Sequence, residues 1–238
     1  SLGVIELTLA LLCEFSPDRD RIIWDVGHQC YAYKLLTGRR ELFPSIRCLG
    51  GLSGFPRRSE SPYDHFGTGH ASTSISAALG MAAARQLNKQ DHHVAAIIGD
   101  GAMTAGLALE ALNQAGHMGH PLIVILNDNE MSISRNVGAL SLFLSSKLSS
   151  GWVRRVKREV EGLLRSIPGI GEDVLGLARR GEDSLISLFT PGMLFEALGF
   201  DYIGPVDGHN IAELRNMLRL AKSEDKPTLI HTLTIPRG

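Results

Sequence analysis

The sequence predicts an α/β fold of the doubly wound kind, with a mainly parallel sheet and helices on both faces. Three observations predict it: short apolar runs of strand length, segments of helical periodicity between them, and polar loops directly after the apolar runs. A strand, a helix and a strand in succession form a right-handed crossover, so neighbouring strands are expected to run parallel. In such a sheet the loops after the strands gather at one edge, where ligands bind.

The expected elements follow from periodicity and from end signals. The first helix, residues 2–15, ends at Ser16-Pro17-Asp18, and a helix of small residues at 73–87 is expected to pack closely on the sheet. The helix at 102–116 is closed by a carboxyl-terminal glycine, and Asn210 is expected to cap the helix at 211–221. A further helix is expected at 191–198, and strands are expected at 21–24, 94–98, 122–126, 200–203 and 228–233.

Two stretches lack this regularity. Residues 37–68 are rich in Gly, Pro and Arg and are expected to be irregular, and a loop of that length usually serves a function. Residues 138–190 combine a basic run with a Pro-Gly break. This second region is expected to form a solvated helix face or a mobile lid, and the two interpretations are compatible.

Composition excludes several function classes. The chain has 238 residues, of which 44% are hydrophobic, and a net charge of −1, so neither nucleic acid nor an anionic membrane is an expected partner. No apolar run approaches the roughly 20 residues that a membrane span needs. The three cysteines lack metal-type spacing, which favours a reducing compartment. We expect one domain over 1–238, incomplete at both ends, because the chain opens inside a helical pattern and stops just after a strand.

The most informative motif is Gly99-Asp100-Gly101, with Asn129 after the next predicted strand. Both polar residues are expected at the carboxyl ends of neighbouring parallel strands. A carboxylate and an amide oxygen there can bind one hard cation such as Mg²⁺, and Gly101 lets a diphosphate approach the backbone. The alternative is an ordinary turn Asp and an ordinary loop Asn. The strand context and the spacing favour a magnesium–diphosphate site.

Residues around Asn129 extend this hypothesis. Met131 is expected to offer its backbone carbonyl to the cation or its thioether to a ring face, and ordinary core packing is the alternative. Asp128 and Glu130 are further candidate ligands. Alternation out of the strand points Asp128 away from Asn129, so Asp128 ranks lower.

Three histidines, His28, His70 and His209, lie in loops at the same predicted edge. They are expected to surround one cleft, where an imidazole can donate to phosphate oxygens or move protons near neutral pH. The alternative is that each is a hydrogen-bonded loop residue. Residues 69–72 open the helix at 73–87, and a helix amino terminus favours an anion. His65 on the same loop is expected to be structural.

Longer motifs carry a family resemblance over essentially the whole chain. They are IIWDVGHQ (22–29), LTGRR (36–40), GGLSGFPRRSES (50–61), FGTGHASTSISAALG (66–80), GDGAMTAG (99–106), LNDNEMSIS (126–134) and DYIGPVDGHN (201–210). Together they resemble the 1-deoxy-D-xylulose-5-phosphate synthases, thiamine-diphosphate enzymes of the transketolase superfamily. The resemblance implies the diphosphate-binding type of the thiamine-diphosphate fold, with thiamine diphosphate and Mg²⁺ as cofactors. It also implies condensation of pyruvate with glyceraldehyde 3-phosphate, release of CO₂, and a homodimer in the full-length protein. The implied location is bacterial cytoplasm or plastid stroma.

The resemblance also implies roles for single residues. Metal ligands would be the side chains of Asp100 and Asn129 and the main-chain oxygen of Met131. Catalytic roles would fall to His28 and to His209, the latter near the reacting carbons. The residues expected to contact the cofactor are His28, Gly69, His70, Ala71, Gly101, Ala102 and Asn129.

Some features depart from the family pattern. The usual Gly-Gly-His would precede residue 1, Ala71 stands where Ser is usual, and residues 234–238 differ from the family's lysine-rich run. The pyrimidine-binding and carboxyl-terminal domains are expected outside this chain, together with the cofactor-activating Glu and the phosphate-binding arginines. Two other interpretations stay open. One is the amino-terminal subunit of a split transketolase-like enzyme, and the other is a non-catalytic phosphate-binding module.

Overall fold

A computed structural model describes residues 2–129 and 191–235, and the structural statements below concern those residues. By its contacts the chain divides into residues 1–136 with 195–238 and residues 137–194. The expected lid at 138–190 and the candidate ligands Glu130 and Met131 lie outside the described residues. The architecture below is that of the first unit.

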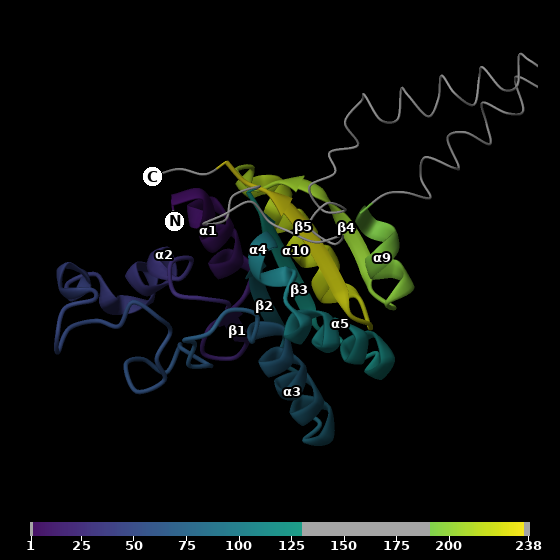
Figure 1. The fold of residues 1–238 in the computed structure, drawn as a ribbon, viewed down its shortest axis with the longest axis horizontal. Coiled ribbons are helices and arrows are strands. Elements are labelled where there is room, and N and C mark those ends of the chain that lie inside the picture. Colours follow the sequence, from purple (N-terminus) through teal and green to yellow (C-terminus); the bar gives the residue numbers. More distant parts are fainter. Residues whose placement is uncertain (1, 130–190, 236–238) are drawn as a thin grey trace, which may run out of the picture. The chain divides into compact units, whose positions relative to one another are not determined.

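The described strands form one parallel sheet of five strands in the order β1-β2-β3-β5-β4 (Figure 1). The first three strands are neighbours in chain order, whereas the chain then passes over the place of β5 to the edge strand β4 and returns. The strands are β1 (Arg21–Trp24), β2 (Val94–Gly99), β3 (Ile123–Asp128), β4 (Asp201–Asp207) and β5 (Thr228–Leu233). This is the predicted doubly wound sheet.

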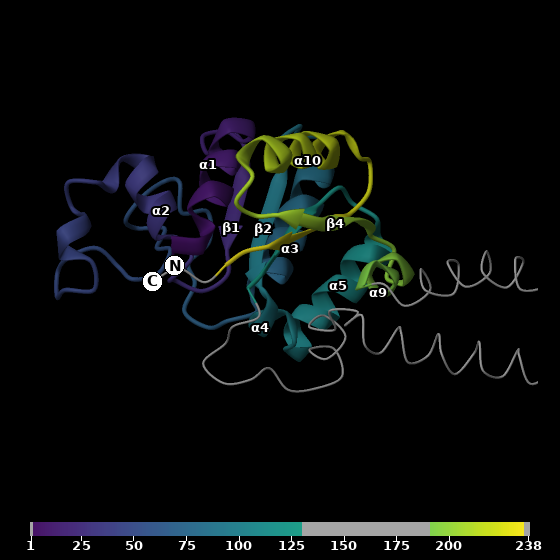
Figure 2. The ribbon, with the colours of Figure 1, turned by 90° about the horizontal axis from the view of Figure 1, so that it is seen from above.

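Helices cover both faces of the sheet, as predicted. Figure 2 shows α1 and α10 on one side of the strands and α5 on the other. Helix α3 packs on α5, β1 and β2. The helices are α1 (Ile5–Glu14, preceded by the 3₁₀ turn Leu2–Val4), α3 (Ser74–Leu87), α5 (Gly106–Met118), α9 (Pro191–Ala197) and α10 (Ile211–Ser223). Because helices shield both faces, every residue of β2 and β3 is buried, and the two strands read as nearly continuous apolar runs.

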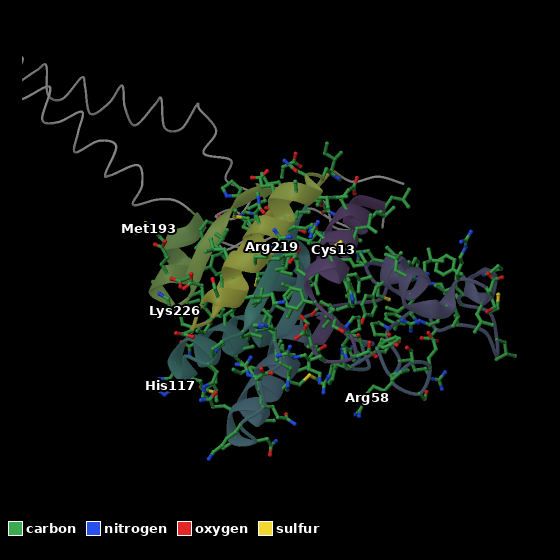
Figure 3. All side chains as sticks on the ribbon, turned by 180° about the vertical axis from the view of Figure 1, so that it is seen from behind. Cys13, Arg58, His117, Met193, Arg219 and Lys226 are labelled. Carbon is green, nitrogen blue, oxygen red and sulfur yellow. The ribbon has the colours of Figure 1, made fainter. Side chains whose placement is uncertain are left out.

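Ion pairs also connect helix α1 to helix α10. Glu14 at the end of α1 accepts hydrogen bonds from Arg215 Nε at 2.6 Å and Arg219 Nε at 2.9 Å. Figure 3 shows Arg219 beside the end of α1 that carries Cys13. Asn210 caps α10 as expected, because its Oδ1 accepts from the Glu213 N–H.

The predicted helix at 102–116 is wrong in two ways. It divides into a short helix α4 (Asp100–Met103) and α5, because Ala105 has extended backbone angles. Its carboxyl-terminal glycine is Gly119, whose φ of +65° gives the left-handed cap, and not Gly116. Gly116 lies within α5, where a Cβ would be 1.5 Å from the carbonyl oxygen of Leu198, so it is a close-packing glycine.

The strand predicted at 200–203 is also too short. Strand β4 continues to Asp207, with a shift of register between Ile203 and Val206. The residues at the shift are Gly204 and Pro205, which read as a strand end in the sequence. Proline is tolerated here because β4 is an edge strand, where an N–H is not needed on the outer side.

The irregular stretch at 37–68 is fixed by a buried group of four charges. Lys34 in the short helix α2 (Tyr31–Lys34) bonds to Glu60, and Arg39 bonds to Glu60 at 3.1 Å and Asp64 at 2.8 Å. Glu60 and Asp64 also accept the main-chain N–H groups of Ser53 and Arg57, respectively. Two positive and two negative charges thus balance, and main-chain N–H groups add hydrogen bonds to both carboxylates. The turns η2 (Leu35–Arg39) and η3 (Phe43–Ser45) are the regular pieces of this stretch.

Asp25 joins the end of β1 to the start of α3. Its side chain is fully buried, and its two carboxylate oxygens accept the N–H groups of Ser72 at 2.7 Å and Ser74 at 3.1 Å. Ser74 is the first residue of α3, and the first N–H groups of a helix have no partner within the helix. Asp25 therefore holds the 69–73 loop against the carboxyl end of β1.

We predict that Asp25→Ala lowers the free energy of unfolding by about 3 kcal/mol, because two charged hydrogen bonds are lost and two buried donors are left. Urea unfolding followed by circular dichroism measures this. Asp91→Ala serves as the control, since the Asp91 side chain is 88% exposed, and a surface change of this kind stays within about 0.5 kcal/mol. Equal effects of the two substitutions would contradict the role given to Asp25.

Acid should weaken the protein partly through Glu60. Burial alone raises the pKa of this carboxyl, but hydrogen bonds from Lys34 and from the Ser53 N–H, with the charge of Lys34, bring it below the ordinary value of 4.5. A carboxyl with a lowered pKa stabilises the fold above its unfolded-state pKa, and this stabilisation is lost as pH falls through its folded-state pKa. Glu60→Gln should therefore flatten the decline in unfolding free energy below pH 4.5. The same change at exposed Glu41 controls for the loss of a carboxylate.

Candidate functional site

The register of the sheet brings the two principal candidates together. Gly99 of β2 pairs with Asn127 of β3, so Asp100 and Asn129 lie one and two residues beyond a paired position on neighbouring strands. The Asp100 side chain is 6% exposed, and Asn129 is half-buried. Asp100 begins α4, with Gly101 and Ala102, both half-buried, next in the same turn. The predicted convergence of a carboxylate and an amide at this edge is thus consistent with the fold.

A second loop is tied to this turn. Ser72 Oγ donates a hydrogen bond of 2.7 Å to the main-chain oxygen of Ala102, and its N–H is held by Asp25. Ser72 has a φ of +73°, a left-handed conformation that costs a non-glycine residue energy and occurs preferentially at functional sites. The exposed residues Gly69, His70 and Ala71 directly precede it. The loops at 69–72 and 99–102 therefore form one hydrogen-bonded unit.

His28 lies exposed in the loop after β1. Partial desolvation, together with the positive charge of Arg47, holds the pKa of His28 below its ordinary value. A Cβ on the preceding Gly27 would be 2.0 Å from the carbonyl oxygen of Gly54, so the 22–29 and 50–61 motifs touch at this point. Val26 has a φ of +54°, which is rare for a β-branched residue and marks the same loop as strained.

The donors at this edge suit a magnesium–diphosphate group. Mg²⁺ is usually held by one or two carboxylates, with phosphate oxygens and water completing its shell. The described residues contain no cluster of three or more His, Cys, Asp or Glu side chains that could hold a metal alone. Next to Gly99, Gln29 is buried, and its Oε1 has no hydrogen-bond partner within the described part of the chain. An unsatisfied buried acceptor of this kind is what an ordered water or a ligand satisfies.

The end of β3 is held by β5 and β4. Thr234 donates its N–H to the main-chain oxygen of Asp128 and its Oγ1 proton to Asn127 Oδ1, both at 2.8 Å. Asp128 Oδ2 lies 3.0 Å from His231 Nε2, and His231 Nδ1 lies 2.8 Å from the Tyr202 hydroxyl. Asp128 thus bonds to the neighbouring strands, in line with its lower rank as a metal ligand.

Four residues that support the site, Asp25, Ser72, His231 and Tyr202, were not predicted from the sequence. A signal existed for His231 and the adjacent Thr232, because two polar residues inside a buried apolar strand need partners. Nothing local marked Asp25 or Ser72, whose partners come from other elements. His65 behaves as expected for a structural residue: Nδ1 accepts from the Ile22 N–H at 3.1 Å, and Nε2 lies 3.0 Å from the Pro17 oxygen.

His209 lies in the loop after β4, the outermost strand on that side of the described sheet. Its Nε2 accepts the Ile235 N–H at 2.8 Å, and its Nδ1 lies 3.3 Å from a carboxylate oxygen of Glu6. In the described residues the imidazole therefore joins α1 to the segment after β5.

No helix in the described ranges is both long and apolar enough to cross a membrane.

Known proteins similar to this chain agree with one another. The sequence model of the 1-deoxy-D-xylulose-5-phosphate synthase family matches residues 1–234. The chain is 66% identical over 234 residues to a 1-deoxy-D-xylulose-5-phosphate synthase of Oleidesulfovibrio alaskensis, covering 98% of this chain and 37% of the relative. It is 67% identical to that of Nitratidesulfovibrio vulgaris (strain DP4), covering 98% and 36%. The chain therefore spans just over a third of the length of these relatives.

Solved structures with the same fold include transketolases. That of Campylobacter jejuni matches with a TM-score of 0.65 and 23% identity, over 98% of this chain and 33% of that one. The transketolase of Leishmania mexicana matches with a TM-score of 0.62 and 24% identity, over 92% of this chain and 29% of that one. At this sequence identity, the similarity to transketolases concerns the fold alone. The sequence matches show that the chain belongs to the 1-deoxy-D-xylulose-5-phosphate synthase family.

Proposed function

We propose that this chain is the magnesium- and diphosphate-binding part of a thiamine-diphosphate-dependent 1-deoxy-D-xylulose-5-phosphate synthase. The enzyme condenses pyruvate with glyceraldehyde 3-phosphate and releases CO₂. The observation that carries the proposal is the alignment of Asp100 and Asn129 on neighbouring strand ends, with the 69–72 loop bonded to Ala102 beside them. A phosphate-binding module without a metal would not need that pair of residues.

Each part of the site has a role in this proposal. Asp100 and Asn129, with the main-chain oxygen of Met131, hold Mg²⁺. The exposed loop residues contact the diphosphate, and its negative charge is favoured at the amino end of α3, a helix of 14 residues. The residues proposed to contact the diphosphate are His28, Gly69, His70, Ala71, Gly101 and Ala102.

The bound cofactor supplies the carbon nucleophile for decarboxylation and for carbon–carbon bond formation. This chain's residues bind and orient it. His28 is suited to donate a hydrogen bond or to exchange a proton near neutral pH, because its lowered pKa keeps much of it neutral there. His209 is proposed to lie on the substrate side, although both of its ring nitrogens already lie near other groups.

The wider setting is part of the same proposal. The relatives named above are bacterial, which supports the cytoplasm over a plastid. The full-length protein is proposed to be a homodimer, on the strength of the family resemblance and the transketolase fold.

We predict that Asp100→Ala removes most magnesium-dependent binding of thiamine diphosphate while the fold stays intact. The substitution takes away the one carboxylate proposed to hold the cation. Calorimetric titration of the protein with thiamine diphosphate, at several Mg²⁺ concentrations, measures the effect, and circular dichroism checks the fold. Glu110→Ala, on the exposed side of α5, is the control. Unchanged binding that needs no magnesium would refute the proposed site and favour a phosphate-binding module.

We also predict that residues 1–238 alone give no measurable 1-deoxy-D-xylulose 5-phosphate. The chain spans 37% of a close relative's length, and the family resemblance places the cofactor-activating Glu and the phosphate-binding arginines elsewhere. Loss of a general acid–base alone costs about 10²–10⁴-fold, and loss of substrate positioning adds to it. Pyruvate-dependent consumption of glyceraldehyde 3-phosphate is the assay. Robust turnover by the purified chain would show that the missing parts are misassigned.

A further inference from the structure

Three polar side chains, two of them buried and the third half-buried, form a line across the sheet beside the candidate site. The Tyr202 hydroxyl on β4 lies 2.8 Å from His231 Nδ1 on β5, and His231 Nε2 lies 3.0 Å from Asp128 Oδ2 on β3. His231 is 3% exposed and Asp128 is 4% exposed. The strand core around them is apolar, so these groups are costly to bury unless they serve one another.

The imidazole of His231 bridges the other two groups. Burial first, and then the negative charges of Asp128 and Glu196, raise the pKa of Tyr202 to about 12, so its hydroxyl stays protonated at neutral pH. His231 Nδ1 faces this hydroxyl and Nε2 faces the Asp128 carboxylate. In the tautomer with the proton on Nε2, the hydroxyl donates to Nδ1 and the imidazole donates to Asp128.

The surrounding backbone is shaped to accept this line. Gly204 has a φ of +148°, and a Cβ there would lie 2.8 Å from the His231 carbonyl oxygen and 2.9 Å from its Cβ. The register shift of β4 at this glycine thus brings the edge strand close over His231. On the other side, the ring of Phe195 stacks parallel to that of Tyr202 with centroids 6.1 Å apart. Tyr202 is therefore held in place by packing as well as by its hydrogen bond.

The line of hydrogen bonds from Tyr202 ends at Asp128, one residue before Asn129. Thr234 fixes the main chain of Asp128 and the side chain of Asn127, and His231 fixes the side chain of Asp128. Groups that orient a ligand residue in this way tune metal affinity without touching the metal. We infer that Tyr202 and His231 are positioning residues, which hold Asp128 and thereby set Asn129 for the cation. The inference rests on the proposed function, because it concerns the same magnesium–diphosphate site.

The test compares two tyrosine-to-phenylalanine substitutions. Tyr202→Phe removes only the hydroxyl at the head of the line of hydrogen bonds. Tyr33→Phe removes the hydroxyl of a buried tyrosine, which donates to the main-chain oxygen of Tyr63 at 2.9 Å in the 37–68 stretch. The two changes are chemically identical, so the general cost of losing a hydrogen-bonded tyrosine hydroxyl applies to both. His231→Gln, which breaks the line in its middle, is the second test variant.

The measured quantity is the Mg²⁺ concentration that gives half-maximal binding of thiamine diphosphate, from calorimetric titrations of the protein. We expect His231→Gln to raise it about 10-fold, as for other residues that orient metal ligands, and Tyr202→Phe to raise it several-fold. Tyr33→Phe should leave it unchanged. Thermal unfolding, measured in parallel without magnesium, reports the cost of each change to the fold.

Asp100→Ala separates failure of this inference from failure of the proposed function. If Asp100→Ala abolishes magnesium-dependent binding while Tyr202→Phe and His231→Gln leave the Mg²⁺ requirement at the wild-type value, the two residues have no positioning role. The same holds if Tyr202→Phe and Tyr33→Phe shift the requirement equally. If Asp100→Ala itself has no effect, the metal site is wrong, and this inference fails with it.

Discussion

The parallel direction of all five strands is the constraint on which the candidate site depends. In a parallel sheet the register of each pair fixes the relative positions of its two strand ends. The pairing of Gly99 with Asn127 and of Asn127 with Thr232 therefore places three chain segments at one level. The segments that follow these residues carry Asp100, Asn129 and Thr234. No contact among the three side chains is needed to bring them there, because main-chain hydrogen bonds deep in the sheet do so.

Strand ends alone would leave the loops mobile, and buried polar contacts remove that freedom. Asp25 uses both carboxylate oxygens on the start of α3, and Ser72 carries the connection on to Ala102. From the neighbouring strand β5 and the segment after it, His231 and Thr234 hold the end of β3 by hydrogen bonds. Each contact joins segments distant in sequence, so the edge is stiffened from both sides while its outer residues, such as His28 and His70, stay exposed. Rigid support beneath accessible polar groups is what ligand binding requires.

Local sequence signals predicted the frame well. The strands at 21–24 and 228–233 have the predicted bounds, and Asn210 caps α10, because apolar periodicity and capping are properties of neighbouring residues. The family resemblance predicted from long motifs is confirmed by the sequence matches. The errors arose where one residue type has two uses. Gly116 is typical of a helix end but permits close packing against Leu198. Gly204 with Pro205 is typical of a strand end but lies at a register shift within β4. The supporting contacts of Asp25 and His231 could not be predicted, because their partners lie 47 and 103 residues away.

The register shift in β4 also affects whether the edge of the sheet can pair with a further strand. Among the described strands, β4 and β1 are the outer ones, and an open edge offers unpaired main-chain groups to any extended chain nearby. Pro205 has no N–H to donate, and the register shift bends the strand where a new partner would have to lie alongside it. At the opposite edge, β1 has only four residues. Within the described residues, neither border therefore favours pairing with a further strand, which disfavours edge-to-edge aggregation through these two strands.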